Sequence, residues 1–304
     1  MKYDARITAV MLAAFVVSQL VGLAFVGGSI KGVETLPSGE KVIEHSETVI
    51  ERPETEGIES LLFILLGVGI ATGMLLLIIK LRLYVVWKAW FFLAVFISIA
   101  AALGVYIDFL AALMLAFALS AAKIIARNAV IHNTTEILMY SGIVVIFVPV
   151  FDVLWATALL LAISVYDFIA VRKTGHMVKM AQFLTESRLF AGFSIPLKEK
   201  GGKQIAVARK TGKMKGKGQK TAILGGGDIA FPLLFSGTVM EQLILSGLSN
   251  FHSFLLTLIV TIAVSLSLLA LLVIAKKGRF YPAMPFLTGG CLAGYALLNV
   301  FLLF

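Results

Sequence analysis

The sequence predicts an all-α, polytopic membrane protein with nine transmembrane helices. Hydrophobic residues make up 60% of the 304 residues and charged residues only 14%, whereas about 25% of a typical soluble domain is charged. The mean hydropathy is +0.99. Apolar runs alternate with charged connectors along the whole chain. We therefore expect one integral membrane domain over residues 1–304 and no separate soluble domain.

Each expected span is a run of roughly 20 mainly apolar residues, the length that crosses the hydrocarbon core of a bilayer. Residues 1–6 precede a full-length apolar run, which we expect to be retained as a span rather than cleaved as a signal peptide. Very short connectors join the third to sixth spans, so these neighbours should pack antiparallel. The nine runs are 7–29, 58–79, 84–103, 106–125, 135–150, 151–171, 221–243, 251–275 and 281–304.

The basic residues set the expected orientation. Lys and Arg lie before the first span and after every even-numbered span, and such residues mark the cytoplasmic side. The largest connector, residues 172–220, holds 13 of the 26 Lys and Arg and only two acidic residues. It is predicted to be a cytoplasmic loop that contacts anionic lipid, with an amphipathic helix at 177–184, an extended piece at 204–208 and a flexible end at 210–220. We expect a multi-pass cell-membrane protein with its N-terminus in the cytoplasm and its C-terminus outside.

Composition also excludes several classes of site. The net charge of +9 does not indicate nucleic-acid binding, because the basic residues flank membrane spans. The single cysteine, Cys291, rules out an intrachain disulfide. The four histidines are scattered through connectors and span ends without metal-ligand spacing. No metal and no cofactor are therefore expected. These histidines are His45, His132, His176 and His252.

Two aspartates lie within segments apolar enough to cross a membrane. Asp167 lies in the sixth span and Asp228 in the seventh. A carboxylate in such a segment is costly and marks a candidate functional site. Asp167 comes five residues before Arg172, and Asp228 comes eight residues after Lys220, which is roughly 7.5 and 12 Å along a helix. Because the two spans run in opposite directions, both carboxylates should lie at similar depth near the cytoplasmic face.

Paired carboxylates suit the hydrolysis of an amide by water. Two carboxylates a few Å apart in a low dielectric share a proton, because both cannot ionise easily. The ionised aspartate takes a proton from water while the protonated one polarises the scissile carbonyl. Because such a pair titrates as a unit, either aspartate can be the one that starts protonated.

Three further features lie near these aspartates. Gly225, Gly226 and Gly227 precede Asp228 and allow irregular backbone beside a cavity; the alternative is tight helix packing through small residues. Pro282, Ala283 and Met284 begin the ninth span at the same face, where they either wall the site or form an ordinary helix start. Tyr166 is about 100° from Asp167 around a helix and either hydrogen-bonds in the site or packs.

The remaining polar residues near span ends are expected to be solvated. Glu136 and Glu241 lie at span borders, where we expect them to reach water. Lys123 should extend to the cytoplasmic interface. Asp108 and Asp152 are predicted to be loop residues on the outer side.

Together, the motifs Tyr166-Asp167, Gly225-Gly226-Gly227-Asp228 and Pro282-Ala283-Met284 resemble those of the presenilin and signal peptide peptidase family of intramembrane aspartyl proteases. These correspond to the family's YD, GxGD and Pro-Ala-Leu motifs, with Met284 in place of leucine. The order of the motifs, the number of spans and the long connector between the aspartates also agree. The cytoplasmic N-terminus resembles presenilin, and the small size resembles an archaeal presenilin homologue.

The resemblance implies an intramembrane-cleaving aspartic endopeptidase of the GxGD type. It implies Asp167 and Asp228 as catalytic residues and transmembrane helices of membrane proteins as substrates. No cofactor and no obligate partner subunit are implied. The residues expected to shape the site and bind substrate are Tyr166, Gly225, Gly226, Gly227, Pro282, Ala283 and Met284.

Two other functions compete with this interpretation. Paired intramembrane acids also serve proton- or cation-coupled transporters and channels, but no convincing repeat relates the two halves of the sequence. Prepilin peptidases also have a GxGD motif, but the cysteine-rich insert usual in them is absent. A non-catalytic scaffold would leave two costly buried acids unexplained.

Overall fold

The computed structural model describes residues 5–37, 39, 41–48, 57–81, 83–126, 128–172, 190–196, 221–275 and 281–303. The amphipathic helix, the extended piece and the flexible end predicted for the basic loop lie outside the described residues. Within them the chain is helical apart from two short hairpins, which confirms the predicted all-α membrane class.

Nine α-helices in the described part follow the order of the nine predicted spans. Eight of them are long and apolar enough to cross a membrane, and α4 is shorter at 17 residues. A 3-10 turn, η1 (Val148–Val150), extends α5. The helices are α1 (Ala5–Ser29), α2 (Ile58–Leu81), α3 (Tyr84–Leu103), α4 (Phe109–Ile125), α5 (Ala129–Phe147), α6 (Val153–Arg172), α8 (Gly227–Leu245), α9 (Asn250–Ile274) and α10 (Met284–Leu302).

Polar side chains explain where two helices begin. The Asp108 carboxylate accepts hydrogen bonds from the amides of Leu110 and Ala111, so α4 begins three residues later than predicted. The Asn128 side chain caps α5 in the same way. As a result α5 begins at Ala129, six residues earlier than the fifth predicted span. Its polar first turns are therefore helical rather than part of a connector.

Two antiparallel hairpins lie between helices. Strands β1 (Ile30–Thr35) and β2 (Lys41–His45) follow α1. Strands β3 (Gly192–Pro196) and β4 (Thr221–Gly225) pair with each other within the segment between α6 and α8. The seventh predicted span was therefore wrong at its start, because residues 221–225 form a strand and the helix begins at Gly227. A short apolar run does not distinguish a strand from the first turn of a helix.

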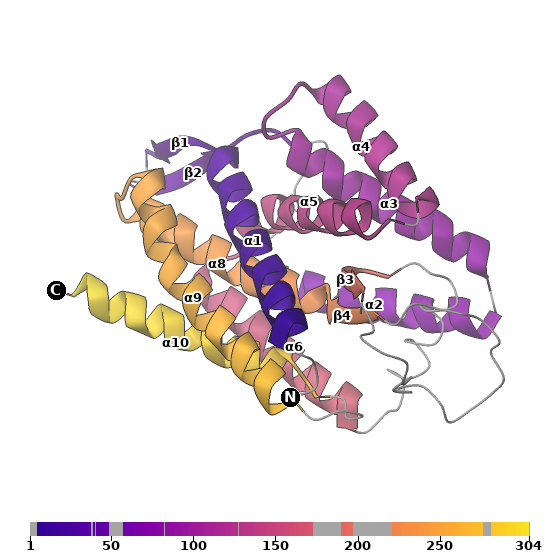
Figure 1. Cartoon of the computed structure of the whole chain (residues 1–304). Coiled ribbons are helices and arrows are strands. Elements are labelled where there is room, and N and C mark those ends of the chain that lie inside the picture. Colours follow the sequence, from indigo (N-terminus) through magenta and orange to yellow (C-terminus); the bar gives the residue numbers. More distant parts are fainter. Residues whose placement is uncertain are drawn as a thin grey trace.

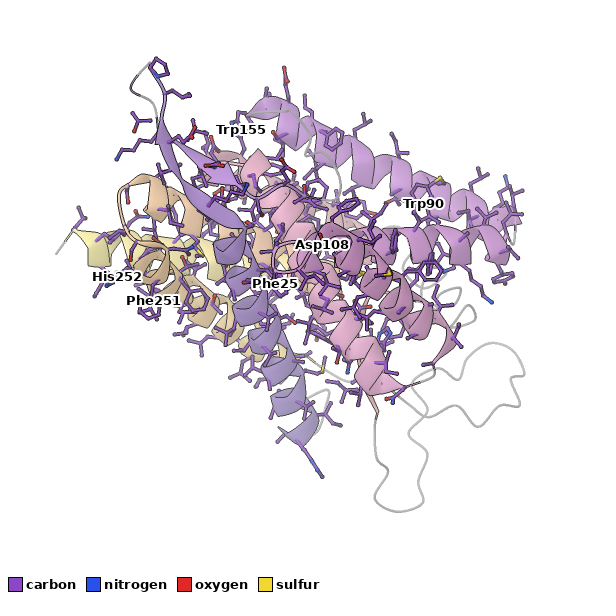
Figure 2. The ribbon with its side chains drawn as sticks, turned by 90° about the horizontal axis from the view of Figure 1, so that it is seen from above. Phe25, Trp90, Asp108, Trp155, Phe251 and His252 are labelled. Atoms are coloured by element: carbon purple, nitrogen blue, oxygen red, sulfur yellow. The ribbon has the colours of Figure 1, made fainter. Side chains whose placement is uncertain are left out.

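Helix α8 lies at the centre of the fold and contacts α1, α5, α6, α9 and α10. Figure 1 shows α1 crossing in front of α8, with α9 and α10 on one side and α3, α4 and α5 on the other. Helix α8 is the most buried of the eight spans and α2 the least. In the view from above, α2 runs along one edge of the group with its side chains directed outward (Figure 2). The fold therefore surrounds α8 and leaves α2 largely exposed.

Candidate active site

Asp167 lies near the C-terminal end of α6, against the start of α10. Its Oδ2 accepts a 3.1 Å hydrogen bond from the backbone amide of Met284. The backbone amide of Ala283 also hydrogen-bonds to this carboxylate. The first amides of a helix have no partner within it, and Ala283 has no side-chain oxygen to cap α10. Asp167 therefore takes the place of a capping residue for α10.

The motif Pro282-Ala283-Met284 provides these amides. Pro282 and Ala283 precede the first turn of α10, and Met284 begins it with its side chain 3% exposed. A second polar contact joins the same two helices one turn away, where the hydroxyls of Ser164 and Thr288 are 2.6 Å apart. The structure therefore brings the predicted Pro-Ala-Met motif directly against Asp167.

Asp228 lies in the first turn of α8, where the positive end of the helix dipole favours a carboxylate. The backbone of Gly225 hydrogen-bonds to this carboxylate. Helices α6 and α8 are in contact, and the two carboxylates lie close enough to interact electrostatically. Asp167 and Asp228 are both partly buried. The two aspartates predicted to pair are thus brought together from neighbouring helices.

The three glycines occupy different positions at the junction of β4 and α8. Gly225 ends β4. Gly226 is buried, and its amide donates a 3.2 Å hydrogen bond to the carbonyl of Ala191. A Cβ on Gly226 would lie 2.7 Å from Oη of Tyr140, whereas Gly227 is exposed. The backbone before Asp228 is irregular, as the glycines predict. Of the three glycines, Gly226 is the one whose backbone packs most closely against another residue, Tyr140.

Tyr166 is 47% exposed on α6. Asp167 is therefore the member of the Tyr-Asp motif that is turned into the helix group, and Tyr166 remains accessible beside it.

A cavity of about 470 Å³ opens beside the glycines. It lies between α2, α5 and α8, and its wall is almost entirely apolar. Gly226 and Gly227 form part of the wall, so the cavity reaches the residues directly before Asp228. Such a space can accept apolar side chains next to a pair of carboxylates. Its other lining residues include Phe63, Gly67, Tyr140, Ile143 and Phe231.

A polar group on α5 that contacts this region was not predicted from the sequence. Glu136 is fully buried and Lys123 is 5% exposed, and their side chains form a 2.6 Å ion pair. The predictions that Glu136 reaches water and that Lys123 extends to the interface were therefore wrong. Glu241 is also buried, 3.4 Å from Nε2 of His45.

A signal for the α5 group was present in the sequence. His132, Asn133, Glu136 and Tyr140 are spaced at i, i+1, i+4 and i+8, which places them on one face of a helix. By contrast, Asp108 and Asp152 are exposed, as predicted, and each also caps the start of a helix. Among the described residues, no group of three or more His, Cys, Asp or Glu side chains could hold a metal ion.

Comparison with known proteins agrees with this geometry. The family described as signal-peptide peptidase, presenilin aspartyl protease matches residues 39–303. No curated protein matches the chain. Two solved structures of a presenilin family intramembrane aspartate protease, in space groups C222 and P2, resemble the fold. The first has a TM-score of 0.59 and 16% identity, over 95% of this chain and 99% of that one. The second has a TM-score of 0.57 and 18% identity, over 96% of each chain.

The likeness to the two solved structures concerns the fold, and the family match extends over most of the sequence. Membership of this protease family argues against the transporter alternative. The chain belongs to the signal-peptide peptidase and presenilin family of intramembrane aspartyl proteases.

Proposed function

We propose that Asp167 and Asp228 are the catalytic pair of this protease. The observation that carries the proposal is that the two carboxylates come from neighbouring helices and lie within electrostatic range of each other. In this mechanism the ionised aspartate removes a proton from water, and the protonated one donates to the scissile carbonyl. The two exchange roles as the tetrahedral intermediate collapses to a new carboxylate and a free amine.

The contact with α10 gives Asp167 a fixed position. Two amides of the Pro-Ala-Met motif hydrogen-bond to its carboxylate, which leaves the rest of that carboxylate for water or substrate. This contact uses the main chain, so it does not depend on whether residue 284 is methionine or leucine. Pro282, Ala283 and Met284 thus act by positioning Asp167.

Transmembrane helices of membrane proteins are the proposed substrates. The apolar cavity between α2, α5 and α8 suits hydrophobic side chains and reaches Gly226 and Gly227. Glycines without side chains also let a substrate backbone come near Asp228. Tyr166, exposed beside Asp167, is proposed to contact the substrate from the other side.

The proposed setting is the cell membrane, with the N-terminus in the cytoplasm, the C-terminus outside and the site near the cytoplasmic face. The positions of Lys and Arg support this orientation. The basic loop at 172–220 is proposed to contact anionic lipid. No obligate partner subunit is proposed.

Binding of a transition-state analogue tests the pair without relying on turnover. The probe is a hydrophobic peptide with a non-hydrolysable hydroxyl in place of the scissile carbonyl, because active sites bind such mimics more tightly than substrates. We expect Asp167→Asn and Asp228→Asn to weaken its binding strongly. Asp152→Asn, at an exposed helix cap, should bind it like wild type. Equal affinity in all four proteins would contradict the proposed pair.

A further inference from the structure

One face of α5 is joined by hydrogen bonds to the hairpin that precedes Asp228. We infer that Glu136, with Lys123 and Tyr140, is a positioning group that fixes the β3–β4 hairpin and through it the catalytic Asp228. The inference rests on the proposed catalytic role of Asp228. Figure 1 shows β3 and β4 side by side at the start of α8, with α5 passing close to them.

Glu136 is the centre of this group. Its Oε1 accepts a 2.6 Å hydrogen bond from Nζ of Lys123 on α4. Its Oε2 accepts a 2.9 Å hydrogen bond from the backbone amide of Gly192 in β3. The hydroxyl of Tyr140 donates to the same oxygen. One fully buried carboxylate therefore joins α4, α5 and β3.

The buried charges are compensated within the group. Nζ of Lys123 also donates to Oγ1 of Thr135 at 3.2 Å and to the carbonyl of His132 at 3.4 Å. A hydrophobic pair of similar volume is often as stable as a buried ion pair. Such a pair could not accept the amide of Gly192, so the feature that only a polar residue provides is the contact with β3.

Two further side chains of α5 hold the same strand. Nε2 of His132 is 2.8 Å from the carbonyl of Gly192. The Asn133 side chain accepts from the amide of Ser194 at 2.9 Å and donates to its carbonyl at 3.0 Å. Together with Glu136, these side chains bind the amides and carbonyls of Gly192 and Ser194. A neighbouring β-strand would make the same kind of backbone hydrogen bonds. The position of β3 is therefore set by α5.

The position of β3 determines the position of the residues that begin α8. Gly192 pairs with Gly225 in the hairpin, and Ala191 accepts the amide of Gly226. Gly192 has a φ of +145°, and a side chain there would collide with the carbonyl oxygen of Leu224. The Tyr140 hydroxyl lies against Gly226 and within electrostatic range of Asp228. A shift of β3 would thus displace the backbone two residues before Asp228.

Glu136 acts on Asp228 through these contacts, so its removal should alter the rate of the chemical step more than substrate binding. Misplacement of a reacting group by about 1 Å can reduce a rate by roughly 100-fold. We therefore expect kcat to fall and KM to stay near its wild-type value when the contact between Glu136 and Gly192 is lost.

Two matched double variants isolate this contact. Lys123→Met with Glu136→Gln, and Lys123→Met with Glu136→Met, both remove the buried charges and keep similar volume. Only the glutamine can still accept hydrogen bonds from Gly192 and Tyr140. With a transmembrane-helix substrate in detergent, we expect kcat to be roughly 10- to 100-fold lower for the Glu136→Met double variant than for the Glu136→Gln double variant. KM should be similar in the two, whereas the thermal midpoint should be lower for the Glu136→Met double variant, because the buried amide of Gly192 and the hydroxyl of Tyr140 lose their acceptor.

A second pair of variants applies if the Glu136→Met double variant does not fold. Tyr140→Phe removes only the hydroxyl between Glu136 and Gly226 and should lower kcat. Ser141→Ala is its control, because this buried hydroxyl, also on α5, donates to the carbonyl of Ile137 at 2.9 Å, its one hydrogen bond among the described residues. Its kcat should match wild type.

Equal kcat in the two double variants, or in Tyr140→Phe and Ser141→Ala, would overturn the positioning role. Asp228→Asn is assayed beside them to separate this failure from that of the proposed function. Loss of cleavage in Asp228→Asn with no effect of the α5 variants would reject the positioning group alone. Full cleavage by Asp228→Asn would reject the catalytic role on which the inference rests.

Discussion

The backbone amide of Met284 donates a 3.1 Å hydrogen bond to Oδ2 of Asp167 and joins the start of α10 to α6. Because the donor belongs to the main chain, the contact can form with many residue types at position 284. The side chain of Met284 has a separate role, since it is buried in the helix core. The contribution of the side chain and that of the amide can therefore be tested separately.

Met284→Leu should retain cleavage and change the free energy of unfolding by less than about 1.5 kcal/mol, because the two side chains have similar volume. Met284→Ala should cost about 2–5 kcal/mol through the cavity that it leaves. Thermal unfolding in detergent and a cleavage assay measure both effects. Loss of cleavage in a stable Met284→Leu variant would show that the methionine itself is required.

The hydroxyl pair of Ser164 and Thr288 should contribute to the packing of α6 on α10. Thr288→Val leaves the Ser164 hydroxyl without this partner, which should cost about 1–3 kcal/mol. Adding Ser164→Ala should recover part of that loss, because removing both polar groups is nearly neutral. Unfolding measurements on the two single variants and the double variant give the coupling free energy between the two hydroxyls. Strictly additive effects would contradict a direct interaction.

The three glycines before Asp228 should differ in their tolerance of alanine. At Gly226 a Cβ would lie 2.7 Å from Oη of Tyr140 and 3.3 Å from the carbonyl carbon of Ala191. At Gly227 the nearest atom would be 3.6 Å away, an ordinary contact. Gly226→Ala should therefore lower kcat by roughly 100-fold, and Gly227→Ala should have a much smaller effect. A larger loss of kcat in Gly227→Ala than in Gly226→Ala would show that the tight packing at Gly226 does not position Asp228.

The apolar cavity should bind substrate. Gly67 lines it, and a Cβ there meets no atom within 4 Å, so Gly67→Phe should direct its ring into this space. We expect KM to rise by roughly tenfold, equivalent to about 1.4 kcal/mol. Gly69→Phe is the control, because Gly69 also faces open space but does not line the cavity. An equal KM in the two variants would show that the substrate does not occupy this cavity.

Activity should fall at both ends of the pH range. At low pH both aspartates are protonated, so no general base is present; at high pH both are ionised, so no general acid is present. A pH profile of kcat/KM for the wild type should therefore be bell-shaped. A flat profile from mildly acidic to strongly alkaline pH would argue against a shared proton.

The sequence predicted the helical spans and both aspartates, because each leaves a local signal. The third predicted span, 84–103, has the same bounds as α3, because a run of about 20 mainly apolar residues is the length of a membrane-spanning helix. Asp167 and Asp228 were identified because a charge within such a run is rare. Their distances from Arg172 and Lys220 predicted a similar depth for both, and the structure brings them together from α6 and α8.

The hairpin and the contacts of the α5 polar face could not be predicted in the same way. Residues 221–225 are mainly apolar and pair with β3, which lies much earlier in the sequence, so their strand conformation depends on a distant partner. Glu136 resembled a solvated border residue because its partners, Lys123 and Gly192, come from other segments. The spacing of the polar residues of α5 places them on one helix face, but it does not show which remote segments that face contacts.

The most direct test is cleavage of a single transmembrane-helix substrate by purified protein in detergent. Wild type, Asp167→Asn, Asp228→Asn and the control Asp152→Asn are compared, with folding checked by thermal unfolding. We expect cleavage by wild type and Asp152→Asn and none by the other two, although all four are folded. Cleavage by a folded Asp167→Asn or Asp228→Asn protein at the wild-type rate would contradict the two-aspartate mechanism.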